Sequence, residues 1–142
     1  MFPRSSGILL HPSSLYGKYG IGTLGNSAIE FIDFLDRSNQ KLWQVFPLGP
    51  TGYGDSPYQC FSAFAGNSYL IDLENLINLG LLETADADKA ELGSDPESID
   101  YGLLYKNKLP LLRKAYENYK KADNEQMKFE IEIFKSENSF WL

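Results

Sequence analysis

The strongest constraint on the fold is a strand, an amphipathic helix and a second strand that follow one another within the first 48 residues. Gly7–Leu10 is a short apolar run closed by turn-forming residues, and Lys41–Leu48 has the aromatic and β-branched content typical of a strand. Between them, apolar residues recur at helical spacing: Ala28, Phe31, Ile32 and Leu35. This order predicts a βαβ unit, with parallel strands and a right-handed crossover.

Local signals predict where this helix begins and ends. Ser27 and Glu30 have the spacing of a capping box, so we expect Ser27 to cap the first turn. Asn39 is a plausible stop, because asparagine tolerates the left-handed conformation that ends many helices.

Composition excludes several classes of function. The 142 residues carry 13 Lys and Arg against 19 Asp and Glu, a net charge of −6, which argues against a nucleic-acid partner. A single Cys60 and a single His11 exclude an internal disulfide and a site built on several histidines, so no metal and no cofactor are expected. Apolar runs are far shorter than the roughly 20 residues of a membrane helix, and cytoplasmic localisation without a membrane partner is expected.

The second strand is followed by a long segment, Gly49–Asn67, that has no helical or strand period. Loops beyond about 12 to 15 residues are uncommon in compact domains and are usually functional or disordered. This one holds four large aromatic residues, which argue against disorder: Tyr53, Tyr58, Phe61 and Phe64. In a parallel α/β protein such a loop lies at the carboxyl edge of the strands, where ligands bind.

The chemistry of Thr51–Gln59 suits a sugar better than a phosphate. Tyrosine rings offer an apolar face to a pyranose, while Ser56 and Gln59 provide groups that match its hydroxyls. An aromatic-packed structural loop is an equally good interpretation of these residues alone. Asp55 follows a glycine and is expected to serve the turn rather than catalysis.

Other candidates for chemistry are weaker. Glycoside chemistry needs two facing carboxylates, but the acids here are predicted on helix faces or in an acidic connection. His11 lies at the expected edge of the sheet, yet a lone histidine more often holds a loop by hydrogen bonding. Cys60 is most simply a small packed side chain.

Beyond the loop, the pattern predicts mostly helices. Tyr69–Asp72 is predicted as an extended piece, Leu73–Leu79 as a short helix stopped by Gly80, and Thr84–Glu97 as an acidic connection without regular structure.

The C-terminal third is predicted to be helical from Asp100, with Pro110 either kinking the helix or starting a new one. The segment from Met127 to Trp141 has both strand and helix periods, and its charged flanks favour a helix. Because chain ends are normally solvated, the apolar Phe140–Leu142 suggests a chain that has been cut.

Several stretches in order resemble the start of the amylomaltases, which are 4-alpha-glucanotransferases. The resemblance covers most of the chain and is densest from Arg4 to Leu82. The matching stretches are Gly7–Leu15, Gly20–Gly25, Trp43–Pro50, Thr51–Gln59, Ser62–Asn67 and Ile99–Gly102. The resemblance implies an α/β fold, namely the N-terminal fragment of a (β/α)8 TIM barrel with helical insertions. Residues 1–50 would form its first βαβ unit. Residues 51–142 would form a glucan-binding loop and a mostly helical, truncated insertion region.

The resemblance also implies an activity, the retaining transfer of α-1,4-glucan segments between maltooligosaccharides through a covalent intermediate. The catalytic acids would lie downstream, so no catalytic residue is expected in this chain and the fragment alone is expected to be inactive. Ser56 and Tyr58 match residues of the donor-side loop, and Tyr53 and Tyr105 match tyrosines that stack on glucan in a second groove. The expected partners are α-1,4-glucans and the remainder of the chain's own barrel.

Two other classes of function remain open from the residues alone. A stand-alone, non-catalytic glucan-binding module would explain the aromatic residues and the missing carboxylate pair. A helical interaction domain would explain the second half but not the long aromatic loop.

Overall fold

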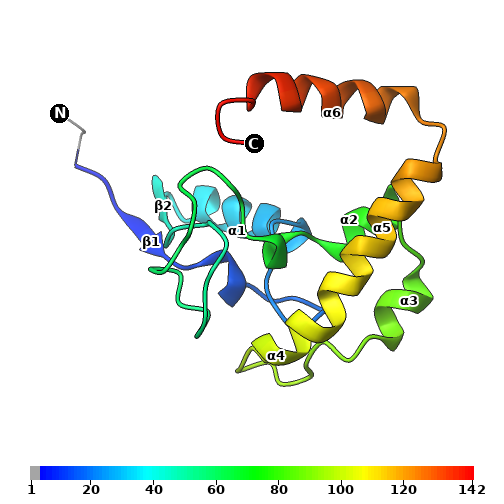
Figure 1. Ribbon diagram of the computed structural model, residues 1–142. Helices are drawn as coiled ribbons and strands as arrows, with labels where there is room; N and C mark the ends of the chain where they lie inside the picture. Colours follow the sequence, from blue (N-terminus) through cyan, green and yellow to red (C-terminus); the bar gives the residue numbers. More distant parts are fainter. Residues whose placement is uncertain (1–3) are drawn as a thin grey trace.

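The computed structural model describes residues 4–142 (Figure 1), so residues 1–3 of the predicted first unit lie outside the described residues. It combines a small parallel sheet with helices that follow it in the chain. The elements, in which η1 and η2 are 3-10 turns and η3 is a π-helix, are β1 Gly7–Leu9, η1 Pro12–Ser14, α1 Asn26–Arg37, β2 Leu42–Gln44, η2 Ser68–Leu70, α2 Leu73–Asn78, α3 Thr84–Lys89, α4 Tyr101–Leu103, η3 Leu104–Lys108, α5 Leu109–Lys121 and α6 Glu125–Glu137.

The predicted βαβ start is confirmed: β1 and β2 are parallel and α1 connects them. Ile8 pairs with Trp43 at the centre of the register, and the Trp43 indole Nε1 donates to the Leu10 carbonyl at 2.7 Å. β2 is shorter than the predicted Lys41–Leu48. The physical reason is its partner, because β1 gives way to η1 at Pro12, which has no N–H to continue a ladder.

The predicted capping box at α1 is wrong. The helix begins at Asn26 with Gly25 as its N-cap, and no side chain caps it. Gly25 packs against the Asp72 carboxylate so closely that a Cβ at this position would overlap it. The predicted stop is confirmed, since Asn39 adopts the left-handed conformation with φ 55°.

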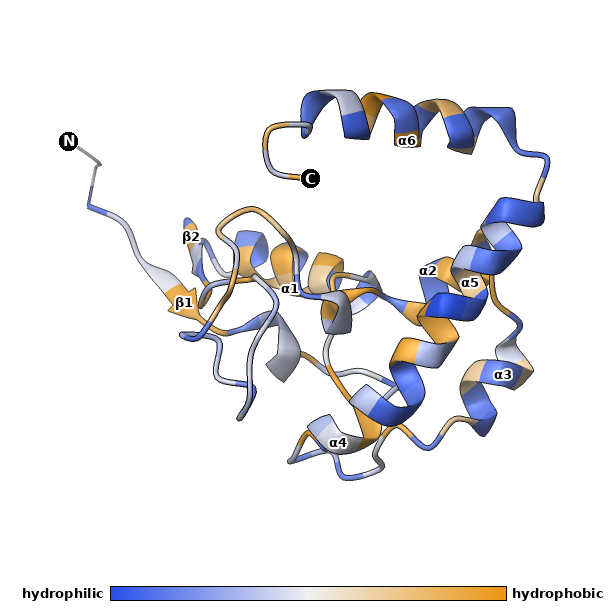
Figure 2. Cartoon of the chain, viewed as in Figure 1, coloured by the Kyte–Doolittle hydropathy of each residue, from blue (hydrophilic) through white to orange (hydrophobic). Residues whose placement is uncertain are grey.

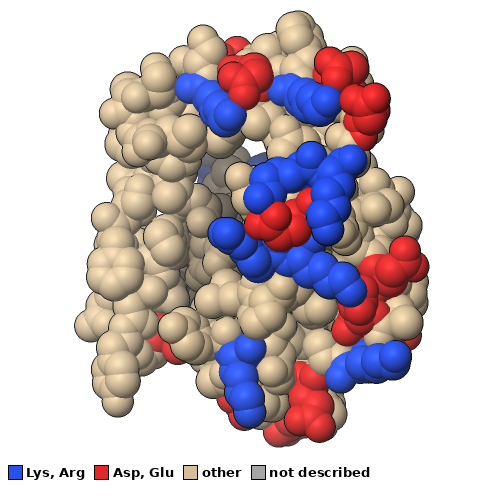
Figure 3. Space-filling model, turned by 45° about the vertical axis from the view of Figure 1, so that its right-hand side comes forward, with Lys and Arg blue, Asp and Glu red and all other residues tan. Residues whose placement is uncertain are grey.

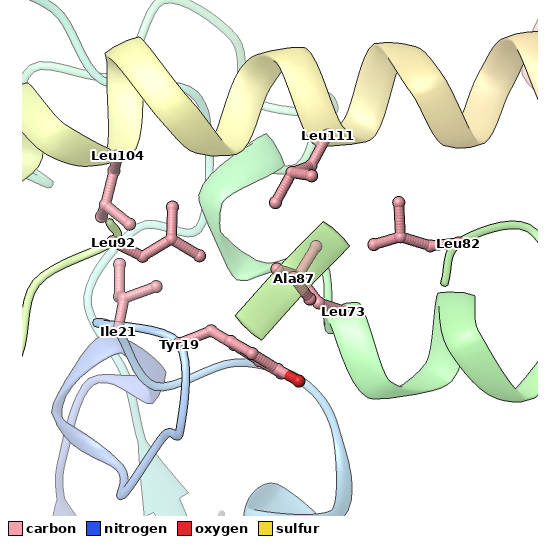
Figure 4. Packing of buried hydrophobic residues seen from close by; sticks show 8 residues of the cluster. All are labelled: Tyr19, Ile21, Leu73, Leu82, Ala87, Leu92, Leu104 and Leu111. Atoms are coloured by element: carbon pink, nitrogen blue, oxygen red, sulfur yellow. The ribbon is translucent and has the colours of Figure 1, made fainter. Parts of the chain in front are cut away.

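The main core lies between the segment of residues 16–22 before α1 and the helices rather than beneath the sheet (Figure 4). Its buried residues come from this segment, from α2 to the residues just after α3, and from the η3–α5 run: Tyr19, Ile21, Leu73, Leu82, Ala87, Leu92, Leu104 and Leu111. The sheet side is less covered. Large apolar residues of α1 remain exposed there, namely Ile29, Ile32 and Phe34.

Two segments differ from the prediction. Residues 84–89 form α3 instead of an irregular connection, because Ala87 enters the core and is 1% exposed. The two residues next to Ala87 form ion pairs with lysines that are distant in the chain: Asp86 with Lys114 at 2.6 Å and Asp88 with Lys18 at 2.7 Å. Residues 68–70 form the 3-10 turn η2 instead of an extended piece, because the Asn67 side chain accepts from the Tyr69 N–H.

The C-terminal helices follow the prediction more closely. Pro110 lies at the junction where the π-helix η3 passes without a break into α5, so the proline marks a change of helix type inside a continuous helical run. The final segment is the helix α6, which is mostly hydrophilic along its length (Figure 2). After α6 the chain turns back toward the loop that follows β2, and Phe140 meets Phe64 with ring centroids 5.1 Å apart (Figure 1).

Candidate functional site

The loop of residues 49–67 follows the sheet in the chain, and its two ends are joined a few residues beyond β2. The Asn67 N–H donates to the Leu48 carbonyl at 2.7 Å, and the Phe61 N–H donates to the Pro50 carbonyl at 3.2 Å. An isolated antiparallel bridge between Thr51 and Cys60 adds a second closure. The loop is therefore a compact excursion with close ends, the kind of surface loop that often carries function.

Two turns shape the tip of this loop. The Asp55 N–H donates to the Gly52 carbonyl at 3.0 Å, and the Gln59 N–H donates to the Ser56 carbonyl at 3.0 Å. Gly54 and Asp55 both have positive φ, at 88° and 52°. The Asp55 carboxylate also accepts from the Thr51 hydroxyl at 3.2 Å. Asp55 thus serves the turn, as the sequence predicts.

A row of three aromatic rings links the end of β1 to the loop. His11 stacks on Phe46 with centroids 5.8 Å apart, and Phe46 packs against Tyr58 at 5.2 Å. Burial lowers the pKa of His11, which favours a neutral imidazole. Its Nδ1 is buried and has no hydrogen-bond partner within residues 4–142. His11 therefore supports the loop by ring packing, and its Nδ1 contributes no hydrogen bond of the kind that the prediction expects.

The predicted sugar-binding tyrosines expose their rings. Tyr58 is 72% exposed behind its contact with Phe46, and Tyr53 at the loop tip is fully exposed. Tyr105 is 69% exposed on η3, a separate element. Ser56 is half-buried within the loop turn. The structure thus brings Tyr53, Ser56 and Tyr58 together in one loop and places Tyr105 on another part of the chain.

Two further tyrosines, Tyr69 and Tyr101, lie between the loop and the helices and were not predicted as site residues. Their rings pack at 6.0 Å. Burial raises the pKa of both phenols, and the Asp55 carboxylate of the loop raises both further. Because the Tyr69 N–H also donates to the Asn67 side chain at 2.9 Å, these two tyrosines connect the end of the loop to α4.

One hollow adjoins the loop, and another lies apart from it. The first, of about 660 Å³, lies between residues 63–72, Leu24 and Leu48. The second, of about 780 Å³, is lined by residues 13–18 and 93–99 and by Tyr101.

The loop carries little charge. Asp55 is the only charged residue in the sequence from 49 to 67. Figure 3 shows Lys, Arg, Asp and Glu gathered over the helical side of the molecule, while the opposite side in that view carries few. Exposed aromatic faces with few charges suit a neutral ligand rich in hydroxyls.

Other predicted candidates contribute little chemistry. The Cys60 Sγ is half-buried and lies 2.9 Å from the Pro57 carbonyl and 3.5 Å from that of Gly49, in agreement with a packed side chain. Within residues 4–142, no group of three or more His, Cys, Asp or Glu is placed to hold a metal ion. No helix in the same range is long and apolar enough to cross a membrane.

Comparison with known proteins agrees with this geometry. A solved amylomaltase from Streptococcus agalactiae in complex with acarbose superimposes with a TM-score of 0.89 and 43% sequence identity, over 97% of this chain and 28% of that one. The 4-alpha-glucanotransferase of Streptococcus pneumoniae is 48% identical over all 142 residues, which span 28% of its length. The corresponding protein of Clostridium butyricum is 55% identical over 116 residues, covering 82% of this chain and 24% of that protein.

The chain thus spans little more than a quarter of the relatives that it matches. The family model described as 4-alpha-glucanotransferase matches residues 10–142, nearly the whole sequence. This chain belongs to the 4-alpha-glucanotransferase family.

Proposed function

We propose that this chain is the N-terminal part of a 4-alpha-glucanotransferase that transfers α-1,4-glucan segments between maltooligosaccharides by a retaining mechanism. The observation that carries the proposal is the family match over residues 10–142, together with an almost uncharged aromatic loop at the end of a parallel strand. In this proposal residues 1–50 begin a (β/α)8 barrel, and residues 51–142 supply the glucan-binding loop and inserted helices.

Ser56 and Tyr58 are assigned to the donor side of the cleavage point. The Tyr58 ring rests on Phe46, which follows β2, and keeps 72% of its surface free to stack on a sugar. A ring that is already held against the end of a strand loses little conformational entropy when a sugar binds. It therefore positions the sugar better than a freely rotating ring does. Ser56 offers a hydroxyl from the same turn.

Tyr53 and Tyr105 are assigned to a second groove that holds the remainder of a long glucan. Both rings are largely exposed, one on the loop and one on η3. Stacking on exposed tyrosines gives affinity without demanding a particular sugar position, which suits a site that guides a chain rather than cleaves it.

The chemistry itself requires a nucleophile and an acid or base, and we assign neither to this chain. Asp55 is committed to its turn, and the ion-paired acids lie on the helical elements. The role of this part is to bind and orient glucan and to keep water from the intermediate, so that a sugar acceptor reacts instead. The 142 residues alone are expected to be inactive.

The test is an assay of maltotriose disproportionation by the complete protein that carries this chain. Formation of glucose and longer maltooligosaccharides with retained anomeric configuration is the expected result. No turnover together with tight maltooligosaccharide binding by the 142-residue chain would instead favour a stand-alone glucan-binding module. Hydrolysis without transfer would mean that the complete protein is a hydrolase and would contradict the proposal.

A further inference from the structure

Lys108 is the largest side chain that is completely buried in the described part of the chain. It ends η3, the same π-helix that carries Tyr105. Lysine is almost never fully buried unless its amine has a partner, because removing the charge from water is costly. Its place in the core therefore indicates a specific task.

The amine of Lys108 joins the helical run to the end of the glucan-binding loop. Nζ donates to the Tyr69 carbonyl in η2 at 2.7 Å. Burial lowers its pKa to about 8, and the nearby Asp72 carboxylate opposes that shift. Asp72 in turn caps α2 through Asn75 and accepts from the Thr23 hydroxyl at 2.5 Å.

Tyr69 is a residue through which the loop and the helical run are connected. Its ring packs against Tyr101 at the start of that run, and its N–H donates at 2.9 Å to the side chain of Asn67, the last residue of the loop. A shift of the Tyr69 backbone would therefore change the spacing between the loop that carries Tyr53 and the helix that carries Tyr105.

The π-helix η3 places a buried lysine and an exposed tyrosine within one short segment. Leu104 and Lys108 are both completely buried, while Tyr105 between them is 69% exposed. π-helical turns are rare and occur frequently at functional sites, where they reorient side chains that a regular helix would place elsewhere. Lys108 holds this turn in place from inside.

We propose that Lys108 is a positioning residue, which sets the separation between Tyr53 and Tyr105 by holding the Tyr69 carbonyl and thereby sets the affinity for long α-1,4-glucans. The affinity part rests on the proposed function, whereas the separation does not.

The first experiment measures the separation directly in the complete protein. Spin labels are attached at Tyr53→Cys and Tyr105→Cys, with Cys60→Ser and any other reactive cysteine replaced. Lys108→Met keeps most of the volume but removes the donor, and it should broaden a narrow distance distribution. Lys121→Met is the matched control, because Lys121 is exposed at the far end of α5, and it should leave the distribution unchanged. If Lys108→Met does not fold, Lys108→Gln, which keeps a shorter donor, should still broaden the distribution.

The second experiment separates positioning from loss of folded protein, in the unlabelled protein with its tyrosines intact. Lys108→Met should raise KM for amylose about fivefold or more, with kcat and KM for maltotriose within about twofold of the parent. If Lys108 had a merely structural role, Lys108→Met would lower kcat by the same factor with both substrates, in proportion to the fraction of protein that remains folded.

An unchanged distance distribution, or parallel changes with both substrates, would overturn the proposal. If the parent protein transfers no glucan, the proposed function fails, and the label distances still decide whether Lys108 sets the separation.

Discussion

Phe46 and Tyr58 pack with ring centroids 5.2 Å apart, which couples the end of β2 to the loop that follows it. His11 also packs on Phe46, and it extends this contact to the segment after β1. The loop tyrosine is thus linked to rings that follow each of the two strands of the sheet. This support is what makes an exposed side chain on a long loop a defined surface for a ligand.

Replacing Tyr58 with alanine in the complete protein should cripple maltotriose disproportionation. Loss of the stacking surface and of sugar orientation should lower kcat/KM about 10- to 100-fold. Tyr16→Ala is the control, because Tyr16 is 84% exposed outside the loop. Near-normal turnover of Tyr58→Ala would contradict the assigned role.

Tyr53→Ala should act on long glucans rather than on the chemistry. Tyr53 is fully exposed and its assigned groove holds distant parts of the chain, so the maltotriose rate should stay within about twofold while the products from amylose change in size. Chromatography of the amylose products measures this. The same product distribution as the parent would argue against a second groove at Tyr53.

Lys108 should make stability rise with pH, the same direction as for a paired carboxylate and the opposite of that for a lysine whose pKa is raised by an ion pair. Its pKa is about 8 in the folded chain against 10.5 ordinarily, so the unfolded chain binds more protons between these values and stability rises with pH across them. Relative to Lys108→Met, the parent chain should gain about 2 kcal/mol between pH 7.5 and 10.

Urea unfolding of both 142-residue chains at the two pH values, followed by tryptophan fluorescence, measures this double difference. Tyrosines and exposed lysines titrate in the same way in both chains, so their contribution to the free energy of unfolding cancels in this double difference. A constant difference across the two pH values would show that the Lys108 amine has its ordinary pKa.

Leu73→Ala should destabilise the chain by about 2 to 4 kcal/mol, because it opens a cavity in the main core where Leu73 is 1% exposed. Leu79→Ala, at the other end of α2 and 57% exposed, is the matched control and should cost less than about 1 kcal/mol. Equal losses for the two variants would mean that the core does not centre on the first turn of α2.

Much of the fold and part of the candidate site follow from the sequence alone. The apolar periods predict both strands and α1, and local stop signals at Asn39 and Gly80 place helix ends correctly, since both residues adopt positive φ. Pro110 marks the junction between η3 and α5 because its ring interrupts the hydrogen-bond ladder of a regular helix. The aromatic loop is visible as a long segment without a period. These features are readable because each is determined by residues close together in the chain.

Only the tertiary structure decided the rest. The α1 cap moved to Gly25 because Asp72, distant in sequence, lies against it, and α3 exists because Ala87 enters a core built from distant segments. In the sequence nothing distinguishes Lys108 from an exposed lysine, and only the structure shows that η3 directs its amine to the Tyr69 carbonyl. In each case the deciding contact joins residues far apart in the chain, and the energy of such a contact has no signature in the local pattern.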